Sequence, residues 1–263
     1  MGLINPKVGI VGGSGRMGAW LKGLLEERGL VVLSAGRNTE LTPAEMARQC
    51  DVVVISVPIA DTEKVISEIG PLVKEDGLIM DLASVKKMPV EVMLKYSKAQ
   101  VVGVHPLFGA DVRSDTALRV AICPGRGDEG LNWICSIFRD EKYKITVIDP
   151  KEHDRMMGLI QGVNHFATLA LGLCISRSGL DVADLHNLST QTFLVRLQRI
   201  KAIIDQPAEL FRSLLMENPS AGEFIGQYRE SIEQLFSITT DSNNEAFEDL
   251  FASLEKAFKI EQK

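Results

Sequence analysis

Four histidines are the residues of this chain best suited to moving protons, and His105 stands out among them by its position. It follows an apolar run at residues 100–104 and precedes a proline. Because proline disfavours a helical conformation in the residue before it, His105 should lie in an extended turn at the end of a strand. A histidine held there beside a cofactor is a natural general base for an alcohol that loses hydride. The alternative is a purely structural histidine.

A glycine-rich turn near the start of the chain indicates which cofactor that would be. Residues 9–20 read GIVGGSGRMGAW, between an apolar run and a stripe of helical spacing, which is the context of a dinucleotide-binding turn. Gly13 would allow the tight turn, Gly15 would leave room for a pyrophosphate, and Gly18 would let the helix pack closely. The free N–H groups of the helix start favour phosphate. The expected contacts are Gly13, Ser14, Gly15, Arg16, Met17 and Gly18, unless this is an ordinary glycine-rich turn.

The second predicted strand, residues 31–35, bears on the choice between NADP and NAD. NAD-selective sites place an acidic residue about 20 residues past the glycines. Here Ser34 and Arg37 occupy that region, and the first carboxylate is Glu40. A hydroxyl and a guanidinium suit a 2′-phosphate, so we expect NADP to be preferred, with NAD possible. The alternative is that Arg37 is a solvated residue that stacks on adenine and leaves a dual-specific enzyme.

Polar residues end two further predicted strands, where ligands of open α/β sheets bind. Ser56, Val57 and Pro58 close the strand at residues 51–57 and would border the nicotinamide ribose, unless they only terminate the strand. Ser84 and Lys86 follow the strand at residues 78–82 and should emerge at the same edge. Ser84 could also cap the next helix.

A long apolar helix predicted over residues 151–178 carries unexpected polar residues. Gln161, His165 and Thr168 are spaced i, i+4 and i+7 and share one face in an α-helix. Polar groups inside an apolar helix need partners, which a substrate or an internal hydrogen-bond network could supply. His153, in the first turn, is interpreted as structural, and His186 is given no role.

Three cations lie close together further along the chain, at Arg196, Arg199 and Lys201. Beside an apolar stripe they could bind a substrate carboxylate. A solvated charged face is the alternative.

The elements that must position these residues divide the chain in two. Strands and helices alternate through residues 1–150, which predicts a doubly wound, Rossmann-type parallel sheet that binds the dinucleotide. Residues 151–263 lack strand patterns and should form a helical substrate-binding domain, with helices at 151–178, 185–205, 208–218, 221–236 and 244–260. Its large apolar faces favour a homodimer formed through this domain.

Composition excludes several other classes of protein. The chain has 263 residues, 45% of them hydrophobic, and a net charge of −6, which argues against nucleic acid as a partner. We expect no membrane span and no signal peptide, and therefore a cytoplasmic protein. The four cysteines are scattered, so neither disulfides nor a metal site is expected.

The motifs, taken in order, resemble the prephenate dehydrogenase family. They are VGGSGRMG, VISVPI, DLASVK, GVHPLFG and EHDRMMGLIQGVNHFATLALGL, and they span nearly the whole chain. The resemblance implies oxidative decarboxylation of prephenate to 4-hydroxyphenylpyruvate in tyrosine biosynthesis. It implies that His105 accepts the hydrogen bond of the ring 4-hydroxyl, that Ser84 helps to hold both groups, and that His165 is a second active-site histidine.

One departure and three alternatives accompany this resemblance. The family's carboxylate-binding arginine aligns with Lys201, and Arg199 or Arg196 would match after a small shift in register. The dinucleotide fold starts at about Lys7 and the chain ends soon after the last helix, so we expect a monofunctional enzyme without a fused chorismate mutase or a regulatory domain. The alternatives are an arogenate dehydrogenase, another dehydrogenase of the same fold, and a non-catalytic dinucleotide sensor.

Overall fold

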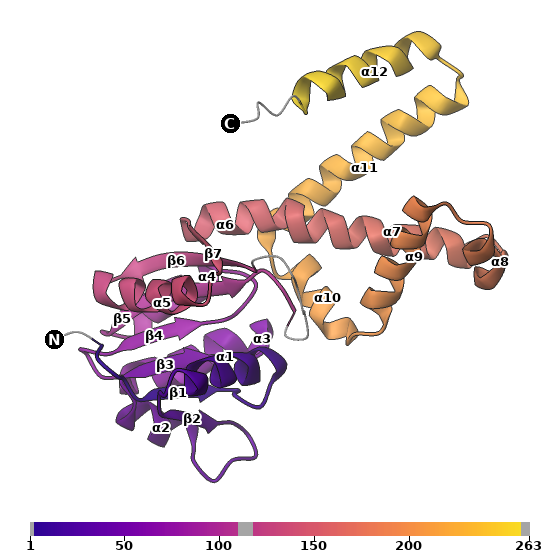
Figure 1. Cartoon of the computed structure of the whole chain (residues 1–263). Helices are drawn as coiled ribbons and strands as arrows, with labels where there is room; N and C mark the ends of the chain where they lie inside the picture. Colours follow the sequence, from indigo (N-terminus) through magenta and orange to yellow (C-terminus); the bar gives the residue numbers. More distant parts are fainter. Residues whose placement is uncertain (1–2, 110–117, 259–263) are drawn as a thin grey trace.

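A seven-stranded sheet forms the first half of the protein and helices form the second (Figure 1). The computed structural model describes residues 3–109 and 118–258. The strands follow the order β2-β1-β3-β4-β5-β6-β7 across the sheet. Their bounds are Val8–Val11 (β1), Val32–Ala35 (β2), Val52–Ile55 (β3), Leu78–Asp81 (β4), Gln100–Pro106 (β5), Arg119–Arg126 (β6) and Lys144–Val147 (β7).

The sheet is mostly parallel, as predicted, but its last two strands run the other way. β1 to β5 are parallel to one another, β6 is antiparallel to β5, and β7 is parallel to β6. A parallel neighbour needs a crossover, usually a helix, and the sequence pattern places no helix between β5 and β6. The chain therefore returns alongside β5, while the helix after β6 allows β7 to run parallel to it.

Helices cover both faces of the sheet. Val8, Ile10 and the other side chains of one face pack under α1 and α5, and Val11, Val53 and the other face pack under α2, α3 and α4. β-branched residues fill the central strands because both of their faces are buried. The bounds are Arg16–Glu27 (α1), Pro43–Gln49 (α2), Ile59–Ile69 (α3), a short 3₁₀ turn at Gly70–Leu72 (η1), Lys87–Tyr96 (α4) and Asp128–Asp140 (α5).

The helical half begins directly after β7. Its elements are Pro150–Met157 (α6), Gly158–Val163 (η2), Asn164–Arg177 (α7), Val182–Asn187 (α8), Gln191–Ile204 (α9), Ala208–Met216 (α10), Pro219–Thr240 (α11) and Asn244–Ala257 (α12). The single helix predicted at residues 185–205 is wrong, because Thr190 starts a new helix by accepting a hydrogen bond from the backbone of Phe193. The predicted last helix, residues 244–260, extends in part beyond the described residues.

The long helix that crosses this half is continuous but not uniform. α6 and α7 are joined by η2, a π-helical segment, which takes up about one extra residue relative to an α-helix. Gly158 and Gly162 allow α11 to come close: a Cβ on Gly162 would lie 2.9 Å from the Cβ of Ala221. The start of α11 therefore packs directly on the π-helical segment.

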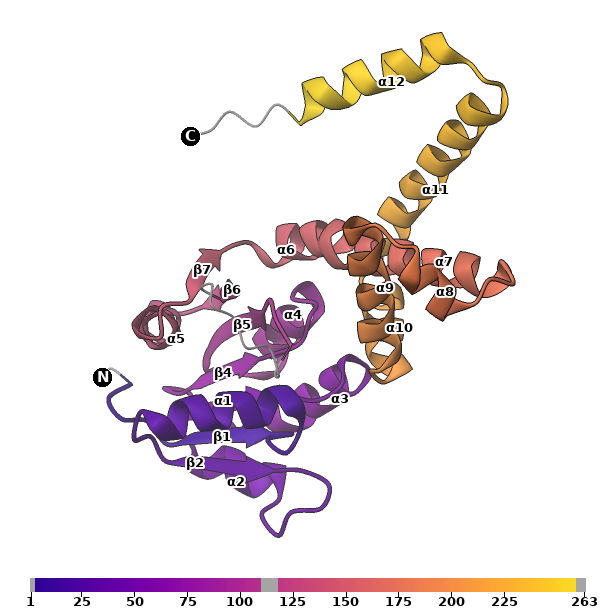
Figure 2. The same ribbon diagram turned by 45° about the vertical axis from the view of Figure 1, so that its right-hand side comes forward.

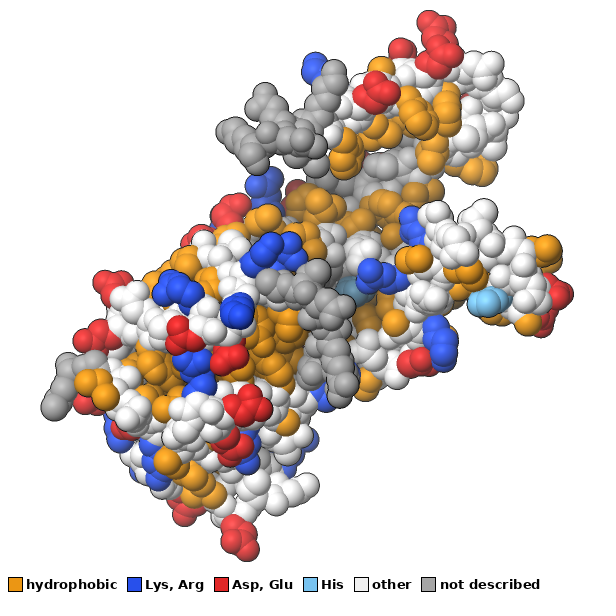
Figure 3. All heavy atoms as spheres, in the orientation of Figure 1, with side chains coloured by type: hydrophobic (Ala, Val, Ile, Leu, Met, Phe, Trp, Pro, Cys, Tyr) orange, Lys and Arg blue, Asp and Glu red, His pale blue; other side chains and the backbone are white. Residues whose placement is uncertain are grey.

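Much of the apolar surface of the helical half is uncovered. α11 and α12 extend away from the rest of the protein in both ribbon views, and apolar side chains gather over them (Figures 1, 2 and 3). Of the described residues in α7 and α12, none is buried. The exposed apolar side chains include Leu173, Ile232, Leu235, Phe236, Phe247, Phe251, Leu254 and Phe258.

One stretch departs from the expectation that no run is long enough to span a membrane. The continuous helix Pro150–Arg177 has a mean hydropathy of 1.4 and, by length and composition alone, could cross a membrane. Polar residues such as Gln161 and His165 interrupt it in the sequence, yet its mean hydropathy stays high. Its first turns are hydrogen-bonded to the sheet half through Asp154.

Candidate active site

The carboxyl ends of the parallel strands line up along one edge of the sheet. Val11 pairs with Ala35 and with Ile55, and Ile55 pairs with Asp81. These four are the last residues of β1, β2, β3 and β4. Ligands of open α/β sheets bind at this edge, so the residues that follow these strands form the candidate site.

The glycine turn after β1 is a tight cradle. Gly12 has a φ of +82°, which favours glycine, and a Cβ there would lie 2.2 Å from the backbone oxygen of Ser56. The left-handed residue of the turn is thus Gly12, which the glycine pattern does not single out. A Cβ on Gly18 would lie 2.5 Å from the oxygen of Gly12, so α1 packs closely as predicted. Gly15 is the N-cap of α1 and has no side-chain cap, which leaves first-turn N–H groups for an anion.

A buried hydroxyl completes this cradle. A Cβ on Gly13 would lie 2.4 Å from Oγ of Ser34, so the glycine turn and the end of β2 touch. Oγ of Ser34 is buried and has no hydrogen-bond partner among the described residues. A cradle without side chains, next to an unpaired hydroxyl, fits the phosphates and adenosine ribose of a dinucleotide.

The remaining residues predicted to bind cofactor lie around this cradle. Arg37 is 86% exposed, and its Nη2 lies 2.8 Å from Oδ2 of Asp61, in the first turn of α3. The side chain of Asp61 therefore brings a carboxylate to Arg37 at the end of β2. The sequence of residues 31–40 alone does not indicate this. Arg16 donates to Gln206 at 3.3 Å, across to the end of α9. Of the other predicted contacts, Ser14 is exposed, Met17, Ser56 and Val57 are half-buried, and Pro58 is exposed.

Lys86 is completely buried, which contradicts the prediction that it emerges at the ligand edge. Its Nζ donates to Oδ2 of Asp81 and, at 3.0 Å, to the carbonyl oxygen of Val104. Both charged side chains are 0% exposed. Burial raises the pKa of the Asp81 carboxyl, and the neighbouring ammonium of Lys86 opposes that rise. The strand-end carboxylate therefore holds Lys86 inside the protein.

His105 lies next to this buried pair, within β5 and not after it. The strand continues through His105 because β6 pairs with it, His105 lying opposite Ala121. Nδ1 of His105 is 2.9 Å from Nε2 of His153, on α6. Nδ1 of His153 is in turn 2.8 Å from Oδ1 of Asp154. The three side chains form a buried, hydrogen-bonded series that crosses from the sheet to the helical half.

The surroundings of His105 keep its ring uncharged. Burial lowers the pKa of His105 well below its ordinary value of 6.5, and the neighbouring groups His153 and Lys86 further disfavour a positive charge on the ring. An imidazole in this state has a lone pair available at neutral pH. His105 can therefore accept a proton from a bound ligand.

Ser84 lies on the loop between β4 and α4 and is half-buried. The alternative that Ser84 caps α4 is wrong, because the capping group is the carboxylate of Asp154. Asp154 accepts hydrogen bonds from the backbone N–H groups of Lys86, at 2.7 Å, and of Lys87, at 3.0 Å. The hydroxyl of Ser84 is thus not needed for the helix start.

His165 lies on α7, with its ring edge-on to that of Phe211 at 5.2 Å between centroids. Its Nδ1 is buried and has no hydrogen-bond partner among the described residues. Burial lowers the pKa of His165, and the charge of Arg199 lowers it further. A buried ring nitrogen without a partner is a suitable contact for a polar group of a bound ligand. No ring contact or hydrogen bond joins His165 to His105 in the described part of the chain.

The predicted polar face around His165 is only partly present. Gln161 lies in the π-helical segment η2, so its spacing to His165 is no longer that of an α-helix. Thr168 donates its hydroxyl hydrogen bond to the backbone oxygen of Asn164, 2.8 Å away, within its own helix.

The three predicted cations all lie on α9 and are exposed. Nζ of Lys201 is 2.9 Å from Oδ2 of Asp205, one turn away on the helix surface. Arg199 is the cation whose charge acts on His165. Lys201 is thus held in a surface ion pair, whereas Arg199 influences the pKa of the histidine.

Sequence reasoning missed Asp81 and Asp154, and it interpreted His153 as structural. A signal existed for Asp81, which is the one charged residue of the strand Leu78–Asp81. The adjacent His153 and Asp154 at a helix start were a further signal. Their partner His105 is 48 residues away, so only the packing of α6 on the sheet reveals the series.

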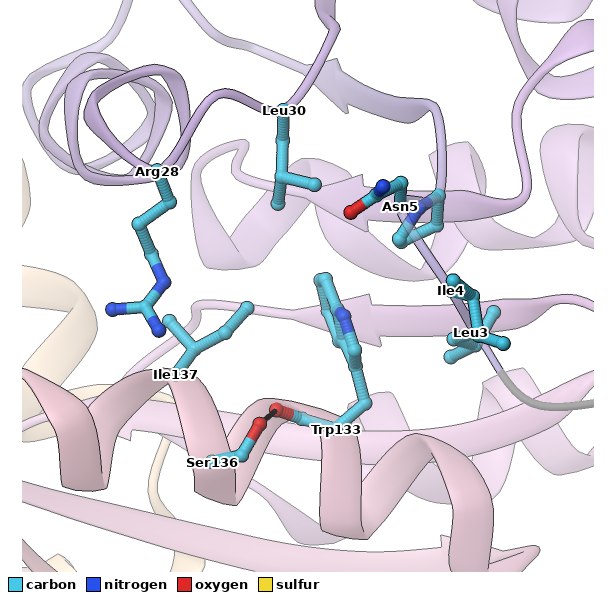
Figure 4. A pocket seen from close by; sticks show the side chains of 9 residues that line it. Leu3, Ile4, Asn5, Arg28, Leu30, Trp133, Ser136 and Ile137 are labelled. Carbon is cyan, nitrogen blue, oxygen red and sulfur yellow. Dashed lines mark hydrogen bonds between the residues drawn. The ribbon is translucent and has the colours of Figure 1, made fainter.

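A hollow of about 320 Å³ lies elsewhere, at the amino ends of β1 and β2 (Figure 4). Its walls include Leu30 and Trp133, and Arg28 beside it is paired with Asp140 and Glu141. The hollow lies at the sheet edge opposite the glycine cradle, so it is separate from the candidate active site.

Comparison with known proteins identifies the family. Residues 31–147 match the model of the prephenate dehydrogenase nucleotide-binding domain, and residues 149–256 match that of the prephenate dehydrogenase dimerisation domain. A T-protein of Enterobacter agglomerans is 31% identical over 97% of this chain and 68% of its own length. The chain belongs to the prephenate dehydrogenase family.

Other members of the prephenate dehydrogenase family agree with this. A probable arogenate/prephenate dehydrogenase of Methanocaldococcus jannaschii is 28% identical over 98% of this chain and 62% of its own length. The chain thus spans about two thirds of the length of these curated relatives. The crystal structure of A. aeolicus prephenate dehydrogenase in complex with hydroxyphenyl propionate and NAD⁺ has the same fold, with a TM-score of 0.75, 18% identity and coverage of 97% of this chain and 98% of that one.

Membership of the prephenate dehydrogenase family assigns a task to each half. The sheet half is the family's nucleotide-binding domain, and the helical half is its dimerisation domain. The matched segment begins at residue 31, so the glycine cradle is identified by its own geometry.

Proposed function

We propose that this protein uses NAD(P) to decarboxylate prephenate oxidatively to 4-hydroxyphenylpyruvate, in tyrosine biosynthesis. The observation that carries the proposal is the state of His105, a buried and uncharged imidazole on the sheet edge that also holds the glycine cradle. An enzyme that oxidises an alcohol needs a proton acceptor at that edge. Membership of the prephenate dehydrogenase family makes the ring 4-hydroxyl of prephenate the corresponding alcohol.

The residues of the site suit each part of this reaction. A bound nicotinamide dinucleotide supplies the hydride acceptor. Nε2 of His105 takes the proton of the 4-hydroxyl while the carbon that bears it is oxidised, and Ser84 orients the hydroxyl from the loop after β4. Loss of the ring carboxylate as carbon dioxide restores aromaticity. Its bonding electrons reach the ring oxygen, which takes the proton back from His105, so no net proton is released.

Arg199 is our choice for the residue that binds a substrate carboxylate. Its charge lowers the pKa of His165, whose Nδ1 has no partner among the described residues. Lys201 is held by Asp205 on the helix surface, and Arg196 is exposed one turn before Arg199. A guanidinium forms paired hydrogen bonds to a carboxylate, which an ammonium cannot do.

We also propose that NADP is preferred over NAD. Ser34 offers a buried, unpaired hydroxyl, and Arg37 offers a guanidinium at the end of the same strand. The ion pair of Arg37 with Asp61 is exposed, and exposed ion pairs contribute little free energy. Arg37 can therefore exchange the carboxylate for a 2′-phosphate at small cost.

The helical half is proposed to form a homodimer that works in the cytoplasm, with neither membrane nor nucleic acid as a partner. Two copies that associate through α7, α11 and α12 would cover the apolar side chains exposed there, including those of the helix Pro150–Arg177. A dimer would show in sedimentation as twice the mass of the chain.

Turnover of candidate substrates tests the proposed function. We expect prephenate to cause an increase in absorbance at the reduced-nicotinamide band, with equal amounts of carbon dioxide and 4-hydroxyphenylpyruvate. Arogenate, which differs only at the side chain, is assayed alongside prephenate. Activity with arogenate alone would assign the alternative substrate, and activity with neither would refute the proposal.

A further inference from the structure

We propose that His153 and Asp154 are positioning residues that fix the tautomer of His105, keeping its Nδ1 protonated and its Nε2 free to act as the base. The proposal rests on the proposed function only for the use of Nε2 as a base. The tautomer itself follows from donors and acceptors in the structure.

Asp154 determines where the first proton lies. Its carboxylate accepts hydrogen bonds from two backbone N–H groups, those of Lys86 and Lys87, which can only donate. A carboxylate with these two donors acts as an acceptor towards the third group as well. Nδ1 of His153, 2.8 Å from Oδ1, must therefore carry a proton and donate it.

The positions of donor and acceptor on His153 determine those on His105. A neutral imidazole has one donor and one acceptor nitrogen, so a protonated Nδ1 makes Nε2 of His153 an acceptor. Nδ1 of His105, 2.9 Å away, must then be the donor. The proton of the neutral His105 ring is thus at Nδ1, and Nε2 keeps its lone pair. Among the described residues Nε2 has no hydrogen-bond partner of its own.

Burial strengthens this assignment. His105 and His153 are 3% and 1% exposed, so water cannot easily replace either partner. A charged His153 would donate from both nitrogens, reverse the bond to His105 and block Nε2 with a proton. The carboxylate of Asp81 is already paired with Lys86, and the carboxylate of Asp154 already accepts from two backbone N–H groups.

The same hydrogen-bonded side chains, His153 and Asp154, stabilise His105 while it carries the proton of the substrate hydroxyl. When Nε2 of His105 accepts the hydroxyl proton, the ring becomes an imidazolium that still donates from Nδ1 to His153. The buried carboxylate of Asp154, at the far end, balances that charge. The proton returns to the ring oxygen in the decarboxylation, so the series ends in its starting state. Asn218 holds the backbone of Asp154 with a hydrogen bond of 2.8 Å, which keeps the helix start in place.

The test reads the tautomer directly by nitrogen-15 NMR of the histidine rings, in the full protein without substrate. We expect the wild type to show a protonated Nδ1 and an unprotonated Nε2 at His105. Asp154→Asn replaces one carboxylate oxygen with an NH2 donor and removes the negative charge, so Nδ1 of His153 loses its fixed acceptor and the fraction of His105 protonated at Nε2 should rise. Turnover should then fall about 10²–10⁴-fold, while nucleotide affinity and KM change little.

Two variants of His153 keep the proposal testable if Asp154→Asn does not fold. His153→Gln retains an acceptor oxygen for Nδ1 of His105 and should keep the tautomer and turnover within about tenfold of wild type. His153→Leu removes the acceptor and should lose both. Matched controls are Asp184→Asn and His186→Gln, on the exposed helix α8, which should change neither reading.

The outcomes separate this proposal from the proposed function. A wild-type His105 protonated at Nε2, or equal turnover by His153→Leu and His153→Gln, would overturn the positioning role. A wild type with the expected tautomer but no activity on prephenate or arogenate would refute the proposed function and leave the positioning role intact.

Discussion

The carboxylate of Asp154 accepts a hydrogen bond from the backbone N–H of Lys86, 2.7 Å away, and this bond joins the two halves of the protein. Lys86 immediately precedes α4, a helix of the sheet half, whereas Asp154 belongs to the first helix of the helical half. One side chain thus caps a helix and supports the histidine pair at the same time. The active site therefore depends on the docking of α6 against the sheet.

The pH dependence of turnover should reveal the surroundings of His105. We predict that kcat/KM stays constant as the pH falls to 6.5 and decreases only at lower pH, because burial lowers the pKa of His105 well below 6.5. The groups around the ring are His153, Asp154, Lys86 and Asp81. A pH–rate profile measures this decrease, and a midpoint at or above 6.5 would contradict the prediction.

The decrease in kcat/KM at low pH must be distinguished from acid unfolding of the protein. Because the pKa of His105 is lower in the folded state, the unfolded chain binds the proton more readily. The contribution of His105 to stability is therefore present above pH 6.5 and is lost as the pH falls below it. Circular dichroism at each pH shows whether the rate decreases before the fold does.

Removing the charge of Lys86 should destabilise the protein strongly. In Lys86→Met the carboxylate of Asp81 stays buried without its partner, which costs about 3–5 kcal/mol of unfolding free energy. Lys86→Met combined with Asp81→Leu should recover most of that loss. Urea unfolding measures both variants. Lys98→Met, which breaks an exposed ion pair with Glu75, is the control and should change stability little.

If Lys86→Met proved as stable as the wild type, the buried ion pair would not have the role described. A double variant less stable than the single one would also contradict it.

Substrate affinity should depend on Arg199 more than on its neighbours. We predict that Arg199→Ala raises KM for prephenate about tenfold to a hundredfold, as a charge-assisted hydrogen bond of about 1.5–3 kcal/mol is lost. Lys201→Ala should change KM little, because Lys201 pairs with Asp205 on the surface. Steady-state kinetics at saturating cofactor measures both. The opposite order of effects would move the carboxylate site to Lys201.

Cofactor preference should respond in opposite directions to two substitutions. Arg37→Ala removes a cation that favours a 2′-phosphate and should lower the affinity for NADP⁺ relative to NAD⁺. Asp61→Asn removes the competing carboxylate 2.8 Å from Arg37 and should raise it. Binding of 2′,5′-ADP and of 5′-AMP measures the effect without turnover. An Arg37→Ala variant with an unchanged ratio would exclude this role.

Much of the fold can be predicted from apolar periodicity, because each strand and helix has to bury one or both faces. The strands at residues 32–35, 52–55 and 78–81 lie within the predicted segments 31–35, 51–57 and 78–82. The reversal of β6 depends on a connection that carries no periodic signal. The π-helical segment is equally invisible, because a change in hydrogen bonding leaves the spacing of apolar residues nearly intact.

The site was only partly predictable for a similar reason. His105 and the glycine turn have local signals, a proline and a set of spaced glycines. His153 and Asp154 gain their significance from contacts with residues far away in the sequence. Burial of Lys86 likewise follows from Asp81, whose carboxylate is inside the protein only because β4 is a central strand.

The central claim is that His105 is the base for oxidation of prephenate, and turnover by His105→Asn tests it most directly. We predict that this variant folds, binds NADP⁺ as the wild type does, and loses about 10²–10⁴-fold in kcat with prephenate, the range for general base catalysis. A folded variant that reduces NADP⁺ with prephenate at nearly the wild-type rate would contradict the account.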